Sequence, residues 1–330
     1  MKRPAIPEEK KMKKLSRIAV LMLALVMVFS LAGCGGQADD GTYVVGICQL
    51  VQHDALDAAT QGFMDALKAE FGDKVVFDNQ NASGDSAMCS TIVNQFIAAD
   101  VDLIMANATP ALQAAAAATA EIPILGTSIT EYGVALEIAD FSGTVGGNIS
   151  GTSDLAPLDQ QAAMLNEWFP DAKNVGLIYC SAEANSQYQV DVVKAELEAM
   201  GYTATLYSFS DSNDLAAVTE SAVAASDVIY LPTDNTVAAN VGIIDNICQP
   251  AGIPVIAGEE GICRGAGVAT LSISYYDLGV ATGKMAAKIL TGEADIATMP
   301  IEYAPATPKF NPTACDALAL TAPEGYVAID

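Results

Sequence analysis

Histidine and basic residues are scarce in this sequence of 330 residues. Lys and Arg together number 15 against 40 Asp and Glu, so the formal net charge is −25 at pH 7. A nucleic-acid partner is excluded, because phosphate binding requires clustered basic side chains. The only histidine is His53, which excludes a histidine-rich metal centre and leaves little choice of general base for catalysis.

The sequence also lacks the short motifs of the common nucleotide-binding and hydrolytic sites. The apolar run at residues 44–50 is not followed by G-x-G-x-x-G, so a dinucleotide would lack its close-approach glycines. There is no G-x-x-x-x-G-K-[ST] loop and no G-x-S-x-G nucleophile elbow. We therefore expect a binding protein without cofactor or metal and not an enzyme. An exported enzyme of another chemistry is the alternative, which turnover of candidate solutes would reveal.

Cysteines are few and widely spaced. Six follow residue 34, and no two have the close spacing of a metal knuckle or a disulfide staple. They are Cys48, Cys89, Cys180, Cys248, Cys263 and Cys315. The first and third of these end predicted strands, where a small thiol packs well. We predict buried free thiols, and at least one disulfide is the alternative.

One long apolar run, residues 18–31, is too short to span a membrane as a helix. It follows a basic stretch and precedes small residues, which is the pattern of a secretory signal. The Leu-Ala-Gly sequence ahead of Cys34 resembles a bacterial lipoprotein processing site, in which Cys34 becomes the lipidated N-terminus. Residues 1–33 would then be removed, and residues 34–42 would form a flexible tether. An ordinary signal peptide with an incidental cysteine is the alternative.

Removal of residues 1–33 would leave 8 basic and 38 acidic residues, so the mature chain would be still more acidic. Docking on anionic lipid through surface charge is therefore disfavoured. Membrane attachment would rely on acyl chains at Cys34, and two such chains make a stable anchor. We expect an extracytoplasmic protein, lipid-anchored to the outer face of the cell membrane or periplasmic.

A strand-turn-helix pattern occurs twice in the chain. In the first copy, residues 42–72, an apolar run predicts a buried strand, and a polar corner and an amphipathic helix follow it. Asp54 is the predicted N-cap of that helix. The second copy, residues 174–201, has the same order, and Met200 is predicted to face inward from its helix.

The repeat continues downstream, since residues 101–105 correspond to 226–230 and residues 122–125 correspond to 253–256. Each half alternates strands and helices with short turns, which predicts a parallel sheet covered by helices on both faces. The predicted fold class is α/β, with two Rossmann-like lobes. Ligands of such sheets bind at the carboxyl ends of the strands, so we expect a ligand cleft between the lobes.

Five segments resemble, in the same order, motifs of the ABC-transporter substrate-binding lipoproteins of the tryptophan/tyrosine-binding type. They are GICQLVQH (46–53), SAEANS (181–186), LPTDNT (231–236), AGEEG (257–261) and YYDLG (275–279). The resemblance implies a periplasmic-binding-protein type I fold and a small amino acid-like ligand, with an aromatic amino acid favoured. It also implies an ABC permease and, through it, an ATPase as partners. We expect the protein itself to be a monomer.

By the same resemblance, the chain crosses three times between two lobes. The N-lobe is expected to contain residues 43–153 and 274–293. The C-lobe is expected to contain residues 154–273 and 294–330.

An amino acid offers a carboxylate, an ammonium group and a side chain. Its pocket therefore needs hydroxyls or helix N-termini, a buried acid, and an apolar or aromatic wall. Candidate anion-binding residues are Thr109, Thr127, Ser128, Asn185 and Ser186. Candidate acids at strand ends are Asp234 and Glu259, and Asn235, which follows Asp234, is a further candidate for ligand contact. Gln52 and His53 could contact the ligand from the N-lobe, and the candidates for stacking on a ring are Tyr132, Tyr188 and Tyr275.

These residues also have purely structural interpretations. Thr109, Ser186 and Asp234 could be helix caps, and one of the adjacent Glu259 and Glu260 could be solvated. Trp168 is predicted to pack in the core. Two functional alternatives also stay open. The first is a receptor that signals to a membrane protein, and nearby genes for a permease and an ATPase would argue against it. The second is a site for another small solute such as a nucleobase.

Overall fold

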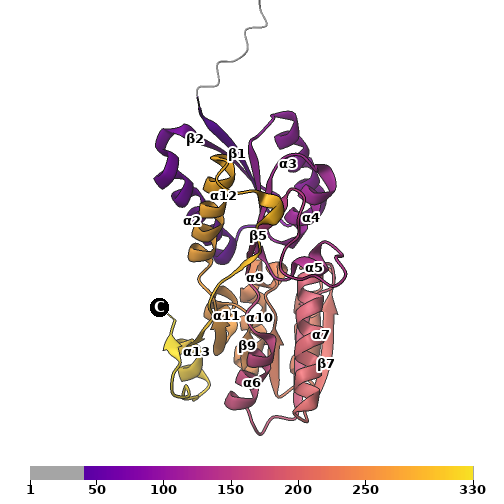
Figure 1. Ribbon diagram of the computed structural model, residues 1–330. Coiled ribbons are helices and arrows are strands. Elements are labelled where there is room, and N and C mark those ends of the chain that lie inside the picture. Colours follow the sequence, from indigo (N-terminus) through magenta and orange to yellow (C-terminus); the bar gives the residue numbers. More distant parts are fainter. Residues whose placement is uncertain (1–40, 330) are drawn as a thin grey trace, which may run out of the picture. The chain divides into compact units, whose positions relative to one another are not determined.

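The computed structural model describes residues 41–329 (Figure 1). The predicted signal segment, Cys34 and nearly all of the predicted tether lie outside the described residues. Within residues 41–329, no helix has both the length and the apolar character needed to cross a membrane. Strands and helices alternate along the chain from Tyr43, as the repeated sequence pattern predicts.

The first sheet has the spatial order β11-β5-β4-β3-β1-β2, and all its neighbouring strands are parallel. Its strands are β1 Tyr43–Gln49, β2 Val75–Asn81, β3 Leu103–Asn107, β4 Ile124–Ile129, β5 Ile149–Ser153 and β11 Glu302–Tyr303. Every residue of β3, β4 and β5 is buried, as expected for parallel strands that are covered on both faces.

The second sheet has the order β13-β12-β10-β9-β8-β6-β7. Its strands are β6 Asn174–Cys180, β7 Thr203–Phe209, β8 Val228–Leu231, β9 Val255–Ala257, β10 Ala269–Ser272, β12 Thr307–Phe310 and β13 Val327–Ala328. The order β9-β8-β6-β7 repeats the order β4-β3-β1-β2 of the first sheet, which confirms the predicted duplication. One pair departs from the predicted parallel arrangement, because β12 runs antiparallel to β10.

We call the first sheet and its helices the N-lobe, and the second sheet and its helices the C-lobe. The N-lobe helices are α2 Asp54–Phe71, η1 Gly72–Lys74, α3 Ser86–Ala98, α4 Thr109–Ala118, α5 Tyr132–Ala135, α12 Tyr275–Leu290 and η2 Ile296–Thr298. The C-lobe helices are α6 Leu158–Trp168, α7 Ala184–Ala199, α8 Leu215–Val223, α9 Asn235–Ala239, α10 Val241–Ala251, α11 Glu260–Ala266 and α13 Pro312–Ala317.

The last crossover differs from the expected position. We expect residues 294–330 in the C-lobe, but β11 pairs with β5 in the first sheet. The chain therefore stays with the N-lobe through Tyr303 and reaches the C-lobe only at β12. The remaining lobe bounds stay a prediction.

Helices α2 and α12 lie side by side, although they are far apart in the sequence (Figure 1). Glycines permit this close approach: a Cβ on Gly279 would lie 2.0 Å from the carbonyl oxygen of Ala59, and one on Gly62 would lie 2.1 Å from that of Tyr276. Both distances are far below a van der Waals contact. Any larger side chain would force the two helices apart, so the close packing of α2 on α12 requires glycine at both positions.

Two predictions at helix ends are wrong in detail. The N-cap of α2 is His53, without a side-chain hydrogen bond, and Asp54 is instead the first helical residue. An acid in the first turn still interacts favourably with the helix dipole. Met200 follows the last residue of α7 and is 41% exposed, because Leu197 already fills the buried position at the end of that helix.

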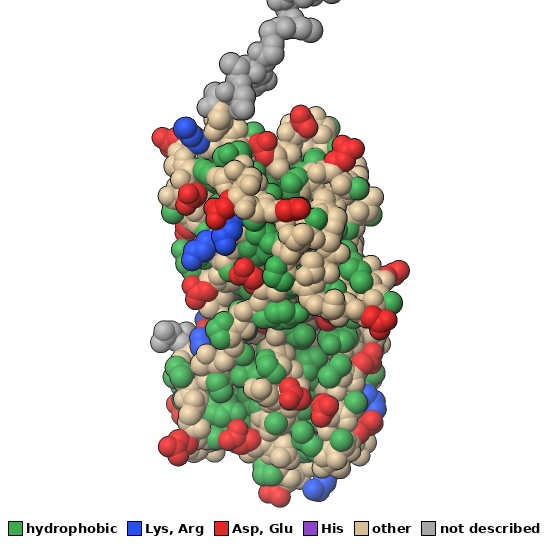
Figure 2. Space-filling model, viewed as in Figure 1, with side chains coloured by type: hydrophobic (Ala, Val, Ile, Leu, Met, Phe, Trp, Pro, Cys, Tyr) green, Lys and Arg blue, Asp and Glu red, His purple; other side chains and the backbone are tan. Residues whose placement is uncertain are grey.

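The cysteine and tryptophan predictions agree with the structure. All six cysteines among the described residues are free and buried. Trp168 is buried at the end of α6, with its ring edge-on to that of Tyr326. Acidic side chains are spread over the visible face and are not gathered in one patch (Figure 2), so this surface shows no separate acidic docking site.

Candidate ligand-binding site

A cavity lies between the carboxyl ends of strands from both sheets. It is lined by His53, Leu56, Ser128, Thr130, Asp154, Asn185, Thr233, Asp234, Asn235, Ala238, Glu259 and Tyr275. Its volume is about 10 Å³, which is room for about one water molecule. A larger ligand would therefore have to separate the lobes or displace these side chains.

Two polar contacts involve residues of the cavity lining, and the first of them joins the two lobes. Nε2 of His53, in the N-lobe, lies 3.3 Å from Oδ1 of Asn235, in the C-lobe. The hydroxyl of Tyr275 donates a hydrogen bond of 2.9 Å to Oδ2 of Asp154, which directly follows β5. Separation of the lobes would therefore break the contact between His53 and Asn235.

Three polar atoms of the cavity lining are buried without a hydrogen-bond partner. They are Oγ of Ser128, Oδ1 of Asp154 and Oδ1 of Asn185. Buried side-chain atoms of this kind number six among residues 41–329, so half of them face one small cavity. An unpaired buried polar atom costs about 1–3 kcal/mol. A ligand that pairs all three would recover that cost, so this cavity is the candidate ligand-binding site.

Ser128 owes its position to an irregularity in β4. The register between β4 and β5 shifts after Gly126, and Ser128 has a left-handed backbone with φ of 56°. Few residues other than glycine adopt this conformation, and bulges commonly redirect a side chain. The strained backbone brings the hydroxyl of Ser128 to the end of the sheet.

Three carboxyl groups of the lining are almost fully buried, and burial raises the pKa of each. The pKa of Asp154 rises to about 6, opposed by the hydrogen bond from Tyr275. The pKa values of Asp234 and Glu259 rise to about 7, and the charge of Glu183 adds to the effect of burial at Asp234. Burial lowers the pKa of His53. Burial therefore disfavours charge on these side chains, and a cationic group of a ligand would favour the ionised form of the acids.

Two of these acids also cap helices. Oδ1 of Asp234 accepts a hydrogen bond of 2.9 Å from the backbone of Val237, and its Oδ2 accepts one of 2.7 Å from the backbone of Cys180. The carboxylate of Glu259 accepts hydrogen bonds from the backbone N–H groups of Gly261 and Ile262. The helix-cap interpretation of Asp234 is thus confirmed, and its role as counter-charge of a ligand stays a prediction.

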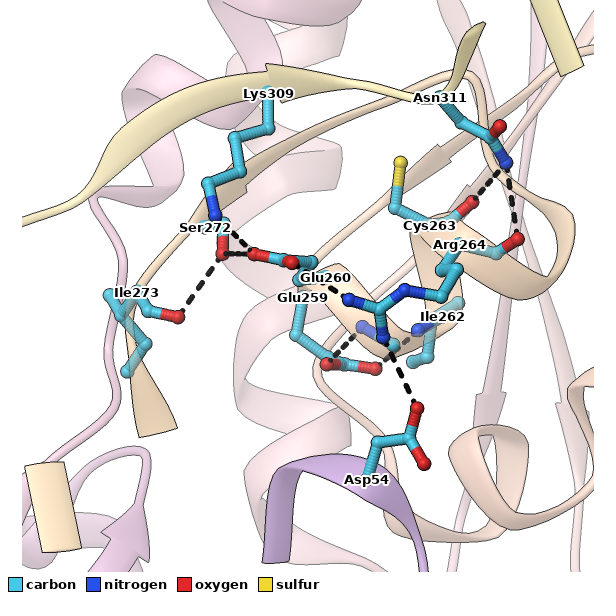
Figure 3. A network of polar contacts seen from close by, with 11 residues as sticks. Asp54, Glu259, Glu260, Ile262, Cys263, Arg264, Ser272, Ile273, Lys309 and Asn311 are labelled. Atoms are coloured by element: carbon cyan, nitrogen blue, oxygen red, sulfur yellow. Dashed lines mark hydrogen bonds and ion pairs between the residues drawn. The ribbon is translucent and has the colours of Figure 1, made fainter. Parts of the chain in front are cut away.

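Glu260 belongs to a separate polar network beside the cavity (Figure 3). Its carboxylate is paired with Lys309 at 2.6 Å and with Arg264 at 2.9 Å. Arg264 also reaches Asp54 across the lobes at 3.2 Å. Of the two adjacent acids, Glu259 is buried and Glu260 is half-buried and ion-paired, so neither is simply solvated.

The structure brings six of the ten predicted site residues to the cavity: His53, Ser128, Asn185, Asp234, Asn235 and Glu259. The other four do not line it. Gln52 is exposed, and Thr109 is buried in the first turn of α4 without acting as its N-cap. Thr127 faces Thr152 inside the sheet at 3.3 Å between hydroxyl oxygens, and Ser186 accepts a hydrogen bond from Asn185.

Of the three tyrosines predicted to stack on a ring, Tyr275 alone lines the cavity. Tyr132 is buried and donates to the carbonyl oxygen of Thr152. The main residue that the sequence analysis missed is Asp154. An acid directly after a strand was the available signal, as it was for Asp234.

No cluster of three or more potential metal ligands occurs in the described part of the chain. The lining instead combines acids, amides, hydroxyls and one aromatic ring. Such groups can hold a small solute that carries both charges and an apolar part.

Comparisons with known proteins agree with this geometry. The family model described as "ABC transporter substrate binding protein" matches residues 44–328. The chain is 35% identical over 253 residues to a tyrosine-binding protein of Clostridioides difficile (strain R20291), covering 76% of this chain and 73% of that protein.

Two solved structures are informative about the conformation. An ABC domain in complex with L-Trp from Streptococcus pneumonia is 32% identical and superposes with a TM-score of 0.82, over 87% of this chain and all of that chain. A ligand-free, open substrate-binding protein with adhesive properties from Clostridium difficile is 35% identical, with a TM-score of 0.67 over 88% of this chain and 99% of that chain.

These similarities confirm the periplasmic-binding-protein type I fold, which more distant solute-binding proteins share. They also identify the kind of protein as a binding protein and not an enzyme. From its fold, its cavity between two lobes and the match over residues 44–328, the chain belongs to the ABC transporter substrate-binding protein family.

Proposed function

We propose that this substrate-binding protein takes up an α-amino acid with an aromatic side chain between its two lobes. The observation that carries the proposal is the set of three unpaired buried atoms, from Ser128, Asp154 and Asn185, around one cavity. The similarity to a tyrosine-binding protein and to a domain solved with L-Trp supports the aromatic class.

The head group of the amino acid would lie at the N-lobe side of the cavity. Asp154 would oppose the ammonium group, because its Oδ1 has no partner among the described residues. Ser128 would donate its hydroxyl hydrogen to the carboxylate, and Thr130 lies in the same lining. A charged hydrogen bond in a buried place is among the stronger polar contacts, so this end of the site would select α-amino acids.

The side chain of the ligand would lie against the apolar part of the lining. Leu56 contributes from α2, Tyr275 from α12 and Ala238 from α9. The ring of Tyr275 is held in place by its hydrogen bond to Asp154. An aromatic ring prefers such a wall, because offset or edge-on ring pairs add about 0.5–1.5 kcal/mol to the gain from burial.

Binding would be coupled to closure of the lobes. The cavity as it stands holds about one water molecule, and residues of both lobes line it. The TM-score is higher against the Trp-bound domain, 0.82, than against the open protein, 0.67, which supports a closed arrangement. A ligand that touches both lobes favours the closed state by its differential affinity for that state.

Calorimetry with purified protein tests the proposal. L-Tyr, L-Trp and L-Phe should bind, whereas tyramine, which lacks the carboxylate, and 3-(4-hydroxyphenyl)propionate, which lacks the ammonium group, should not. Leucine and galactose serve as controls for an aliphatic amino acid and for a sugar. Binding of a sugar or nucleobase but of no amino acid would refute the proposal.

We further propose that acyl chains on Cys34 hold the protein on the outer face of the membrane, where it acts as a monomer and serves a permease and its ATPase. The motif at Cys34 supports the anchor. Cys34→Ser should release the protein from the membrane fraction, and mass spectrometry should find lipid on the wild-type N-terminus. Unchanged membrane retention without attached lipid would refute the anchor.

A further inference from the structure

Within residues 41–329, the side-chain amide of Asn185 forms hydrogen bonds through its nitrogen, Nδ2, and none through its oxygen, Oδ1. Nδ2 donates to the carbonyl oxygen of Thr233 at 3.1 Å, and it lies 3.3 Å from both Oε2 of Glu183 and Oγ of Ser186. Asn185 is 5% exposed, in the first turn of α7. All the hydrogen-bond donors of this amide are therefore used inside the C-lobe.

The two ends of the amide cannot be exchanged. A flipped amide would place its oxygen against the carboxylate of Glu183 and the carbonyl oxygen of Thr233, so that acceptors would face acceptors. Gln189 fixes Thr233 in this position, since it donates to the carbonyl oxygen of Thr233 and accepts from its N–H group, at 3.0 Å in each case. Oδ1 of Asn185 is therefore the free end, and it can only accept.

Oδ1 of Asn185 has no hydrogen-bond partner among the described residues. The amide of Asn235 donates to Glu183 at 2.7 Å, and the carboxylate of Asp234 accepts from two backbone N–H groups. This finding differs from the sequence-based assignment of Asn185 to an anion. An acceptor beside the carboxylate of Glu183 repels an anion, and it requires an N–H or O–H group.

We propose that Asn185 selects ligands whose side chain carries a hydrogen-bond donor, such as a phenol hydroxyl or an indole N–H. This inference rests on the proposed function, in which the head group lies at Ser128 and Asp154 in and next to the N-lobe sheet. The far end of the ligand then meets the C-lobe, where Asn185 lines the cavity. A ligand without a donor leaves Oδ1 unpaired, and sites built for such a bond discriminate strongly against the analogue that lacks it.

A series of related amino acids tests this on the unmodified protein. L-Tyr, L-Trp and 4-amino-L-phenylalanine carry a donor, whereas L-Phe and 4-fluoro-L-phenylalanine do not. Calorimetry should give dissociation constants about tenfold or more lower for L-Tyr and 4-amino-L-phenylalanine than for L-Phe. Equal affinity for L-Tyr and L-Phe would overturn the inference and leave the proposed function standing. Failure of every compound to bind would remove both.

A matched pair of variants locates the effect. Asn185→Leu should bind L-Tyr and L-Phe with nearly equal affinity. Gln187→Leu changes a neighbouring amide of the same helix that bonds only to Asp191 on the surface, and it should keep the wild-type preference. If Asn185→Leu weakens both ligands equally, Asn185 holds the common head group and the inference fails. If Asn185→Leu does not fold, the ligand series on the wild type decides alone.

Discussion

The hydroxyl of Tyr275 and the carboxylate of Asp154 form a hydrogen bond of 2.9 Å that joins the start of α12 to the residue after β5. The bond occupies Oδ2 and leaves Oδ1 of Asp154 free toward the cavity. Asp154 thus holds the ring of Tyr275 through one carboxyl oxygen and keeps the other oxygen available to a ligand. The site depends on a pair of residues from chain segments that are far apart in the sequence.

Asp154→Asn should weaken an ammonium-bearing ligand about 30-fold or more, because removal of one partner of a buried charge pair typically costs about 2–5 kcal/mol. The matched control is Asp159→Asn, an exposed acid in the first turn of α6, which should leave affinity unchanged. Calorimetry with the tightest-binding amino acid measures both. Wild-type affinity in Asp154→Asn would assign the ammonium group to another acid.

Asp234→Asn should mainly affect folding. The carboxylate accepts backbone N–H groups of Cys180 and Val237 on different oxygens, and an amide retains only one acceptor. The unpaired N–H group should cost about 1–3 kcal/mol of unfolding free energy, measured by urea denaturation, with a smaller loss of affinity than Asp154→Asn shows. The reverse pattern, unchanged stability with a 30-fold loss of affinity, would make Asp234 the counter-charge of the ligand.

The unliganded protein should lose stability as the pH rises through the range in which Asp154 ionises. Its pKa is about 6 in the folded protein against 3.8 as the ordinary value, so the folded state binds the proton more tightly than the unfolded chain. The resulting stabilisation is complete below about pH 4 and is lost as pH rises through 6, by up to about 3 kcal/mol.

Asp154→Asn removes this titration while keeping the shape of the side chain. The difference in unfolding free energy between wild type and variant should therefore change between pH 4.5 and pH 7.5, with the wild type relatively weaker at the higher pH. Urea denaturation without ligand at three pH values gives the comparison. Parallel profiles for the two proteins would show that Asp154 does not titrate in this range.

Asp54→Asn should reduce ligand affinity slightly, and only at low salt. Asp54 pairs with Arg264 across the lobes at 3.2 Å, but both side chains are largely exposed, and such pairs contribute about 0.2–1 kcal/mol. The loss should be less than about fivefold and should disappear in 1 M salt. Asp65→Asn on the same helix, whose partner Tyr276 is in the same lobe, is the control, and an equal loss there would point to net charge alone.

Gly279→Ala should destabilise the N-lobe, because a Cβ at this position would lie 2.0 Å from the carbonyl oxygen of Ala59. Overpacking of this kind typically costs about 1–3 kcal/mol. Gly242→Ala in α10 is the control, since no atom lies within 4 Å of its added Cβ, and it should be neutral or slightly stabilising. Thermal denaturation compares the two variants, and equal melting temperatures would contradict the tight packing of α2 on α12.

Much of the fold could be predicted from the sequence, because parallel strands and amphipathic helices leave strong periodic patterns. The same logic places residues after strands at the sheet edge, and it found Ser128, Asp234 and Glu259. It missed Asp154, because β5, with the sequence ISGTS, has few strong strand formers and contains a glycine. When a strand is not recognised from the sequence, the residue that follows it is not identified as lying at the sheet edge.

The choice between neighbouring residues could not be predicted. Thr127 and Ser128 were both candidates, and a shift in strand register turns only Ser128 to the cavity. Asn185 and Ser186 differ by about 100° around a helix, so one lines the cavity and the other is buried behind it. Such choices depend on tertiary geometry that local sequence does not encode.

The pairing of α2 with α12 also constrains the order in which the chain can fold. Chain synthesis must add about 200 further residues after α2 before its partner exists, and closing so long a loop carries an entropic cost. The strands from β6 to β10, by contrast, form a continuous stretch of the second sheet. During synthesis the N-lobe therefore cannot be completed until the chain through α12 has been made. A chain that stops before Tyr275 would leave one face of α2 uncovered.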